Sequence, residues 1–177
     1  MPEHAFVALG SNVAAERNLP LAIAELAALG RIASISQVYE TAPIGPAGQP
    51  TFLNAAALLL TDLAPHVLRD RLREIEARLG RARTPDKYAP RTIDLDICLH
   101  GNTILDSDEL TLPAAEIVSR AYLATTLAEL APAFRHPTTG ETLAEIADRL
   151  RGQGHLIPRP DIREQIDLAI GASDRGP

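Results

Sequence analysis

Two aspartates and a run of basic residues lie close together between residues 81 and 100. Asp94 and Asp96 belong to a stretch that alternates apolar and polar residues, which predicts a β-strand over 91–99. Alternate side chains of a strand point to opposite faces, so both carboxylates share one face, roughly 7 Å apart. The other face is predicted to enter a core, with Ile93, Leu95, Ile97 and Leu99.

Paired carboxylates on one face predict a site for divalent cations, because like charges repel unless a cation lies between them. Mg²⁺ is usually held by one or two carboxylates together with substrate phosphates. Two metal ions about 3.5–4 Å apart can clamp an in-line displacement. Basic residues precede the strand, at Arg81, Arg83, Lys87 and Arg91. Guanidinium groups beside metal-binding carboxylates suit phosphoryl-type transfer, which depends on positioning and charge neutralisation.

The same residues also fit a plain surface, since an Asp-x-Asp pair on an exposed strand and a basic run in a loop are commonly just solvated. Composition narrows the possible ligands. The chain has 177 residues, 46% of them hydrophobic, and a net charge of −6. A negative chain is a poor binder of nucleic acid or anionic membranes. The local basic cluster therefore indicates a small, phosphate-rich ligand.

Length, cysteine content and hydropathy predict where the protein works. The length fits one domain. No apolar run reaches the ~18–20 residues that span a bilayer, and the start of the sequence lacks a secretory signal pattern. A single cysteine suits a reducing compartment. A cytoplasmic protein is expected, without membrane or nucleic-acid partners, and a monomer is the default expectation.

The order of the predicted elements indicates an α+β fold. Strand, helix, strand, strand, helix and strand follow each other, at 5–10, 18–29, 32–39, 51–60, 64–79 and 91–99. This is the ferredoxin-like βαββαβ plan, an antiparallel sheet with helices on one face. Asp94 and Asp96 are then expected on the uncovered face, where a ligand can reach them.

A C-terminal hairpin and helical extension follow the last predicted strand. A short strand near 103–105, a helix over 116–130 interrupted near 119–122, and a helix capped by Thr142 are expected. Residues 1–152 are predicted to form a single domain. Residues 153–177 are predicted to be a tail, with one short helix marked by Ile162, Ile166 and Ile170 and a loose end from Gly171.

Two segments rich in proline, glycine or charge, 40–50 and 81–90, are predicted as loops. The first is longer than a hairpin needs, and long ordered loops tend to be functional. Phe52 and Asn54 follow it on one strand face. Such a pair suits a flat heterocycle, by stacking and hydrogen bonding, and it equally fits a core phenylalanine beside a turn asparagine. The chain has neither a G-x-x-x-x-G-K-[ST] phosphate loop nor a G-x-G-x-x-G fingerprint.

Four sequence blocks together resemble one enzyme family. They are Ala8–Asn12 (ALGSN), Tyr39–Pro46 (YETAPIGP), Gln49–Asn54 (QPTFLN) and Ala89–Asp96 (APRTIDLD). Their order and spacing are similar to those of 6-hydroxymethyl-7,8-dihydropterin pyrophosphokinase, and the resemblance runs from about residue 6 to about residue 137. It implies an ATP-dependent diphosphotransferase of folate biosynthesis that transfers pyrophosphate from ATP to the pterin alcohol and releases AMP.

The resemblance also implies roles for individual residues. ATP is the co-substrate, and two Mg²⁺ ions are implied on Asp94 and Asp96. The implied catalytic set adds two arginines to these ligands, Arg81 and Arg91. The implied pterin site consists of Thr41, Ala42, Pro43, Ile44, Phe52, Asn54, Tyr88 and Tyr122. The implied ATP site consists of Arg73, Glu76, Arg81, Arg83, Arg91 and Arg120, and Asn12 sits near a matching position.

The chain departs from the family pattern after Pro113. The family usually has a histidine that contacts ATP at the next position, where this chain has Ala114. Where many members carry an arginine shortly afterwards, Glu116 stands here. Losing one hydrogen bond to a charged group costs roughly 1.5–3 kcal/mol, so weaker ATP binding is expected. Two alternatives stay open: a pterin- or nucleotide-binding module with impaired catalysis, and a two-metal nucleotidyltransferase that attacks the α-phosphorus.

Overall fold

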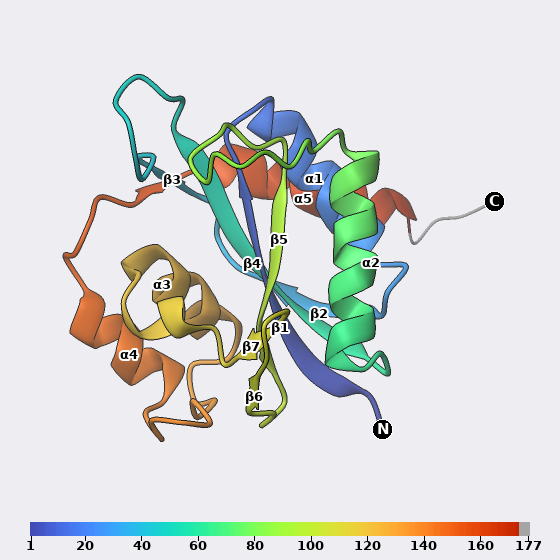
Figure 1. The fold of residues 1–177 in the computed structure, drawn as a ribbon, viewed down its shortest axis with the longest axis vertical. Helices are drawn as coiled ribbons and strands as arrows, with labels where there is room; N and C mark the ends of the chain where they lie inside the picture. The colour runs from blue at the N-terminus through green and yellow to red at the C-terminus, as the bar shows by residue number, and fades with distance from the viewer. Residues whose placement is uncertain (174–177) are drawn as a thin grey trace.

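The computed structural model describes residues 1–173 and shows an α+β fold built on an antiparallel sheet (Figure 1). Five α-helices occur in this part of the chain. The elements are β1 Glu3–Ser11, α1 Ala15–Leu26, β2 Arg31–Ile35, β3 Tyr39–Thr41, β4 Phe52–Thr61, α2 Pro65–Arg78, β5 Asp94–His100, β6 Leu105–Asp106, β7 Thr111–Leu112, the 3₁₀ helix η1 Ala115–Val118, α3 Ala121–Leu130, α4 Leu143–Leu150, β8 Ile157–Pro158 and α5 Pro160–Ser173.

The main sheet has the strand order β5-β1-β4-β3-β8, and β2 pairs with β4 beside β3. Every pair is antiparallel. The strand that carries the aspartates, β5, lies at one edge of the sheet, and β1 separates it from β4. A separate two-stranded hairpin of β6 and β7 follows β5.

The two faces of the sheet carry two separate cores. Helices α1, α2 and α5 pack on one face, with Leu19, Leu72 and Ile166 among its fully buried residues. Helices α3 and α4 pack on the other face, around Phe6 and Leu127. The prediction of a second face without helices is therefore wrong, because α3 and α4 pack on it around Phe6 (Figure 1). Asp96 on β5 is nevertheless exposed.

A bulge in β5 overturns the predicted orientation of one core residue. Leu95 and Ile97 lie in the first core, as predicted, but Leu99 lies in the second core beside Cys98. The register explains this difference, because Phe6 pairs with Leu99 while the next residue of β1 pairs with Ile97. One extra residue in a strand shifts the alternation of all residues beyond it.

The predicted single strand over 32–39 is wrong, since the structure has two strands, β2 and β3, separated by residues 36–38. Ser36 explains the break. Its hydroxyl accepts a hydrogen bond from the backbone N–H of Ala56 at 2.8 Å and so takes the place of a strand carbonyl. The predicted loop over 40–50 also begins two residues later, because Glu40 and Thr41 belong to β3.

The helix predictions agree better with the structure. The predicted helix over 64–79 is confirmed as α2, and Thr142 caps α4 in a capping box with Glu145. Helix α1 begins three residues before the predicted start, which places Pro20 inside it rather than in its first turn. The predicted tail helix is confirmed as α5. The prediction that the loose end begins at Gly171 is wrong, because α5 continues to Ser173, and residues 174–177 lie outside the described residues.

The buried residues of α5 predict that this helix stabilises the whole domain. We expect Ile166→Ala to lower the free energy of unfolding by about 2–5 kcal/mol, because Ile166 is fully buried in the first core. Leu168→Ala is the matched control on the same helix, since Leu168 is 68% exposed. Urea unfolding of both variants measures the difference. Equal losses in the two variants would show that α5 does not contribute to the core.

Candidate active site

The strand register places the predicted aspartate pair and the predicted pair of Phe52 and Asn54 near each other in the sheet, with Asp94 and Asn54 on one face. Gly10 of β1 pairs with Asp94 on one side and with Asn54 on the other. Ala8 pairs with Asp96 in the next row on that face. Neighbouring strands lie about 4.8 Å apart, so the aspartate strand and the Asn54 strand are about 10 Å apart across β1.

Gly10 lies between these two strands and has no side chain to fill the space above the sheet. A Cβ atom at this position would lie 3.2 Å from the side-chain oxygen of Asn54 and 3.9 Å from the ring of Phe52. The first of these distances is tighter than ordinary van der Waals contact. A glycine on β1 therefore leaves no side chain between the aspartates and the Phe52–Asn54 side of this face, where Asn54 itself is buried.

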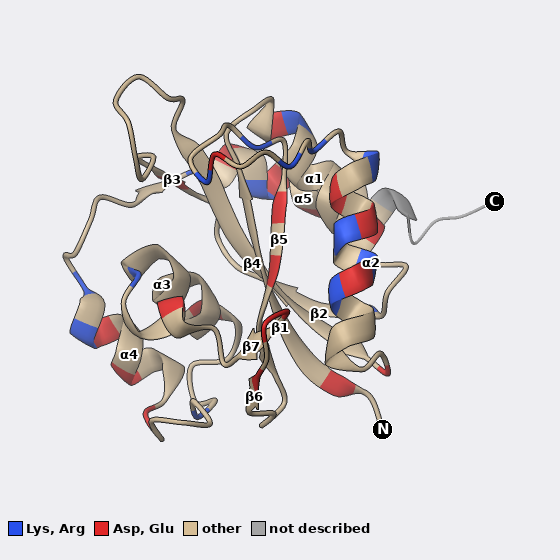
Figure 2. Ribbon diagram, viewed as in Figure 1, with Lys and Arg blue, Asp and Glu red and all other residues tan. Residues whose placement is uncertain are grey.

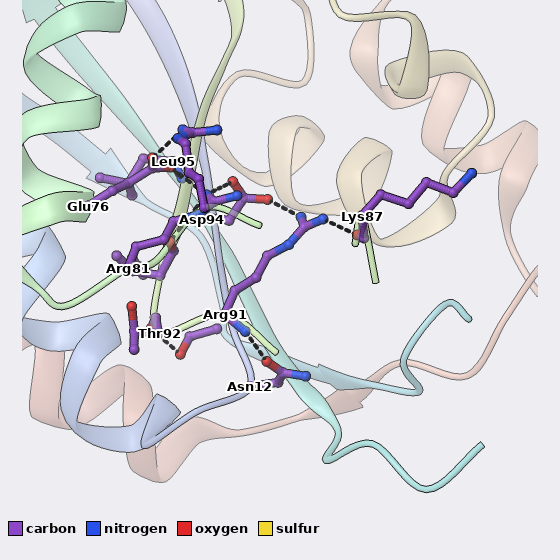
Figure 3. Close-up of polar contacts among 11 residues, drawn as sticks. Asn12, Glu76, Arg81, Lys87, Arg91, Thr92, Asp94 and Leu95 are labelled. Atoms are coloured by element: carbon purple, nitrogen blue, oxygen red, sulfur yellow. Dashed lines mark hydrogen bonds and ion pairs between the residues drawn. The ribbon is translucent and has the colours of Figure 1, made fainter. Parts of the chain in front are cut away.

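Glu76 of α2 is the buried anchor of the charged cluster (Figure 3). Its side chain is 3% exposed. One carboxylate oxygen accepts hydrogen bonds from Arg81 and from the backbone N–H of Leu95, both at 2.8 Å, and the other accepts from Arg83 at 2.7 Å. A buried carboxylate is tolerated only when such donors compensate its lost hydration. Glu76 thereby fixes two arginines and the start of β5 together.

The two aspartates differ in their partners. Asp94 accepts a hydrogen bond from Arg91 at 2.6 Å and forms an ion pair with Arg81 (Figure 3). The Asp96 side chain is exposed, and no hydrogen bond or ion pair to it is formed by residues 1–173. The pKa of Asp96 is raised to about 7, first by desolvation and then by the charges of Asp94 and Glu76, while the charges of Arg81 and Arg91 act in the opposite direction. Asp96 is thus a carboxylate that lacks a cation.

Residues of the β1 end hold the segment that leads into β5. The backbone N–H of Arg91 donates to the side-chain oxygen of Asn12 at 2.7 Å, and the Ser11 hydroxyl donates to the carbonyl of Thr92 at 2.6 Å (Figure 3). The amide of Asn12 also donates to Gln49 and to the carbonyl of Pro50, both at 3.5 Å. Asn12 therefore links Arg91, which directly follows loop 81–90, to loop 42–50.

The two loops also contact each other directly. Gln49 donates a hydrogen bond to the carbonyl of Tyr88, and the Tyr88 ring packs so tightly on Gly45 that a Cβ there would come within 2.6 Å of it. The ammonium group of Lys87 lies 4.9 Å from the centre of the same ring. Gln49 was not among the predicted site residues, because a glutamine in a proline-rich loop gives no sequence signal of its own.

On the other side of the site, Asn54 donates a hydrogen bond to the hydroxyl of Thr41 at 2.7 Å, and Thr41 pairs with Phe52 at the end of β3. Tyr122 lies in the first turn of α3. The pKa of Tyr122 is raised, mainly by burial, and the charges of Cys98, Asp94 and Asp96 act in the same direction. Tyr122 packs against the second core, on the face of the sheet that Ala8 shares.

The remaining predicted residues lie around this centre. Ala42, Pro43 and Ile44 belong to loop 42–50, and Ile44 is 53% exposed. Arg120 is exposed at the N-cap of α3. Arg73 is exposed on α2, and no hydrogen bond or ion pair within residues 1–173 joins it to the aspartates. Arg73 and Arg120 are thus predicted ATP-site residues that no hydrogen bond or ion pair within residues 1–173 joins to the cluster.

The candidate metal ligands fit Mg²⁺ better than a metal ion whose ligands are all protein side chains. Residues 1–173 contain no group of three or more His, Cys, Asp or Glu side chains placed to hold a metal ion. Mg²⁺ needs only one or two carboxylates when substrate phosphates complete its shell. Asp94 and the bare Asp96 supply such a pair, and basic residues line the loop next to them (Figure 2). No helix in the same part of the chain is long and apolar enough to cross a membrane.

The α+β fold places paired carboxylates on its sheet beside arginines that Glu76 holds. This arrangement is typical of enzymes that transfer phosphoryl groups. The model of the 7,8-dihydro-6-hydroxymethylpterin-pyrophosphokinase family matches residues 6–132. The chain belongs to this family.

Similar proteins carry the corresponding name. The 2-amino-4-hydroxy-6-hydroxymethyldihydropteridine pyrophosphokinase of Pseudomonas aeruginosa is 41% identical over 149 residues, which cover 82% of this chain and 91% of the relative. The protein of that name from Haemophilus influenzae is 36% identical over 130 residues, or 72% of this chain and 81% of the relative.

A solved structure shares the fold at low sequence identity. Plasmodium falciparum HPPK-DHPS with pteroate has a TM-score of 0.70 and 13% identity, and the match covers 86% of this chain and 46% of that one. The chain thus spans about half the length of that protein. The likeness shows that the arrangement of helices around the antiparallel sheet is the fold of the solved structure.

Glu76 provides a test of the anchor. We expect Glu76→Gln to lower the free energy of unfolding by about 2 kcal/mol, because hydrogen bonds to a charged group contribute about 1.5–3 kcal/mol. Glu74→Gln on the same helix is the control, since Glu74 and its partner Arg71 are about half exposed and such pairs contribute about 0–1 kcal/mol. Chemical denaturation compares the two variants. A loss no larger than that of the control would contradict the anchor role.

Proposed function

We propose how this chain performs the reaction of its family. The chain transfers the pyrophosphoryl group of ATP to 6-hydroxymethyl-7,8-dihydropterin in folate synthesis, and it is an ATP-dependent diphosphotransferase. The main observation in support of the proposed site is the row of paired residues across the sheet. Asp94 and Asn54 both pair with Gly10, so a charged half and an aromatic, hydrogen-bonding half share one open face.

Asp94 and Asp96 are proposed as the ligands of two Mg²⁺ ions. When bound, Mg²⁺ neutralises charge on the ATP phosphates. The unpartnered Asp96 supports this assignment, because a bare carboxylate next to Asp94 and Glu76 favours the arrival of a cation. Arg81 and Arg91 now pair with Asp94. We infer that both guanidinium groups turn from Asp94 toward the phosphates when ATP binds.

ATP is proposed to lie over loop 81–90 and the start of β5. Arg83 and Arg120 are exposed near this cluster and can reach phosphate oxygens. Glu76 is proposed to act on ATP through the arginines that it holds, because it is buried against them. Arg73, on the outer surface of α2, is proposed to contact the more distant parts of ATP.

The pterin is proposed to lie on the other half of the same face. Phe52 and Tyr122 would stack on its two sides, because flat rings favour offset stacking on aromatic side chains. The amide of Asn54 and the backbone from Thr41 through Ala42 and Pro43 to Ile44 would hydrogen-bond its polar edge, and Tyr88 would close over it. The two halves lie about 10 Å apart, which leaves room for a phosphate group between them.

In this arrangement the hydroxymethyl oxygen of the pterin forms a bond to the β-phosphorus of ATP, while the bond between that phosphorus and the oxygen of AMP breaks. The hydroxyl proton of the pterin alcohol is released to water. Arg81 and Arg91 stabilise negative charge on the transferred group. Loops 42–50 and 81–90 already meet at Tyr88. Their closure excludes water, which would otherwise hydrolyse ATP.

The strand order β5-β1-β4 with β2 and β3 beyond it supports the proposal that the first strands and helices follow the ferredoxin-like plan. A monomeric state and a cytoplasmic location stay predictions. A domain limit near residue 152 also stays a prediction, although Ile162 and Ile166 of α5 beyond it pack in the first core.

The products of the reaction test this function. With the pterin alcohol, ATP and Mg²⁺, we expect AMP and the pterin pyrophosphate in equal amounts. Asp96→Asn should lower kcat by about a thousandfold, because it removes a metal ligand worth several kcal/mol of charge stabilisation. Chromatography of the nucleotides measures this. Release of pyrophosphate instead of AMP would favour a nucleotidyltransferase, and pterin binding without AMP would favour a binding module.

Position 114, where the family usually has a histidine, predicts that introducing this histidine raises the affinity for ATP. The backbone N–H of Ala114 bonds to the carbonyl of Cys98 at 2.9 Å, which places position 114 beside the strand of the aspartates. We expect Ala114→His to lower the KM for ATP by about tenfold, since one hydrogen bond to a charged group is worth about 1.5–3 kcal/mol. The KM for the pterin serves as the internal control and should not change. An unchanged KM for ATP would show that other residues replace the histidine.

A further inference from the structure

The C-terminal segment fastens the short strand that precedes the pterin loop. β3 has three residues. On one side it pairs with β4, and on the other side Tyr39 and Glu40 pair with Pro158 and Ile157 of β8. The backbone N–H of Arg159 donates to the carbonyl of Val38 at 2.8 Å. β3 would be an edge strand without this segment, and β8 covers that edge.

The side chain of Arg159 binds carboxylates from three separate elements. Its guanidinium group lies 3.0 Å from Glu40 of β3, 2.8 Å from Glu16 of α1 and 2.8 Å from Asp161 of α5. The Arg159 side chain is 23% exposed. The planar guanidinium group can satisfy several acceptors at fixed angles. Arg159 thus fixes β3 relative to two helices at once.

Glu40 connects Arg159 to the neck of loop 42–50, which is the point where β3 and β4 separate at the pair of Thr41 with Phe52. Its other carboxylate oxygen accepts a hydrogen bond from the Thr51 hydroxyl at 2.8 Å. Glu40 and Thr51 flank the pair of Thr41 with Phe52, where the two strands separate into the loop. The Thr41 hydroxyl in turn accepts from Asn54. The chain of contacts from Arg159 therefore ends at the residues proposed to hold the pterin.

The same strand is tied to the helix that carries Tyr122. The carboxylate of Glu129, near the C-terminal end of α3, accepts hydrogen bonds from the Tyr39 hydroxyl and, at 2.7 Å, from the backbone N–H of Gln37. β3 consequently sets the position of Thr41 relative to the helix that carries Tyr122. Movement of β3 would also disturb its pairing with Phe52 at the start of β4.

We propose that Arg159 is a positioning residue for the pterin site. Through Glu40 it holds β3 and the neck of loop 42–50 in the geometry that binds the pterin, although it touches neither substrate nor metal. ATP binding depends on loop 81–90, α2 and β5, which Arg159 does not contact. The proposal rests on the proposed placement of the pterin at Phe52 and Asn54.

Steady-state kinetics with both substrates varied tests the role. We expect Arg159→Met to raise the KM for the pterin by about tenfold, because small misplacements of binding groups cost that order of affinity. The kcat and the KM for ATP should stay within about twofold, since those interactions lie elsewhere. Arg159→Lys should give an intermediate KM for the pterin, because an ammonium group keeps the charge but loses the planar fork.

A matched control separates positioning from a general effect on α5. Arg163 lies on the same helix and pairs with Asp167 and the carbonyl of Ile35, so Arg163→Met disturbs α5 without touching Glu40. It should leave all kinetic constants unchanged. Glu40→Gln covers the case in which Arg159→Met fails to fold. It keeps the contacts of Arg159 with the helices and should also raise the KM for the pterin alone.

Asn54→Ala distinguishes failure of this inference from failure of the proposed pterin site. If Asn54→Ala raises the KM for the pterin while Arg159→Met and Glu40→Gln do not, the positioning role is wrong and the site stands. If Asn54→Ala has no effect either, the placement of the pterin is wrong and the inference falls with it. Equal increases in the KM for ATP and for the pterin would also overturn the role, because they would show a general loss of structure.

Discussion

The burial of the Glu76 carboxylate is the constraint on which the charged half of the site depends. Taking a carboxylate out of water costs several kcal/mol unless donors surround it. The donors here are Arg81, Arg83 and the backbone N–H of Leu95. One helix residue thus fixes the beginning of loop 81–90 and the beginning of β5 in the same place. The position of Asp94, which starts β5, follows from this anchor.

The balance of charge at this anchor explains why the two aspartates are not equivalent. Arg81 and Arg91 neutralise Asp94, whereas Asp96 faces the negative charges of Asp94 and Glu76 without a partner. In the proposed site, the ATP phosphates would compete with Asp94 for the same arginines, and each arginine that moved would leave a carboxylate free for a cation. On this proposal, binding of the nucleotide and binding of the metal would favour each other through the same ion pairs.

Sequence periodicity predicts those features of the fold that depend on residues close together in the chain, such as helices and the buried faces of strands. It places Leu95 and Ile97 in a core, and it finds α2 and α5, because the 3.6- and 2-residue periods record which face is buried. It fails at Leu99, since one bulged residue reverses the alternation. The cover that α3 and α4 give to the second face, and the row through Gly10, depend on long-range packing and register. No local pattern contains that information.

Register also explains how two loops far apart in the sequence serve one reaction. β1 lies between the aspartate strand and the strand of Asn54, and Asn12 at its end bonds to both loops. The Tyr88 ring fills the space beside Gly45. Neither loop can therefore open or close without disturbing the contacts of the other. Because one loop borders the proposed ATP half and the other borders the proposed pterin half, we expect a closed and dry site to form only when both substrates are in place. The same contacts that bring the substrates together would then suppress transfer to water.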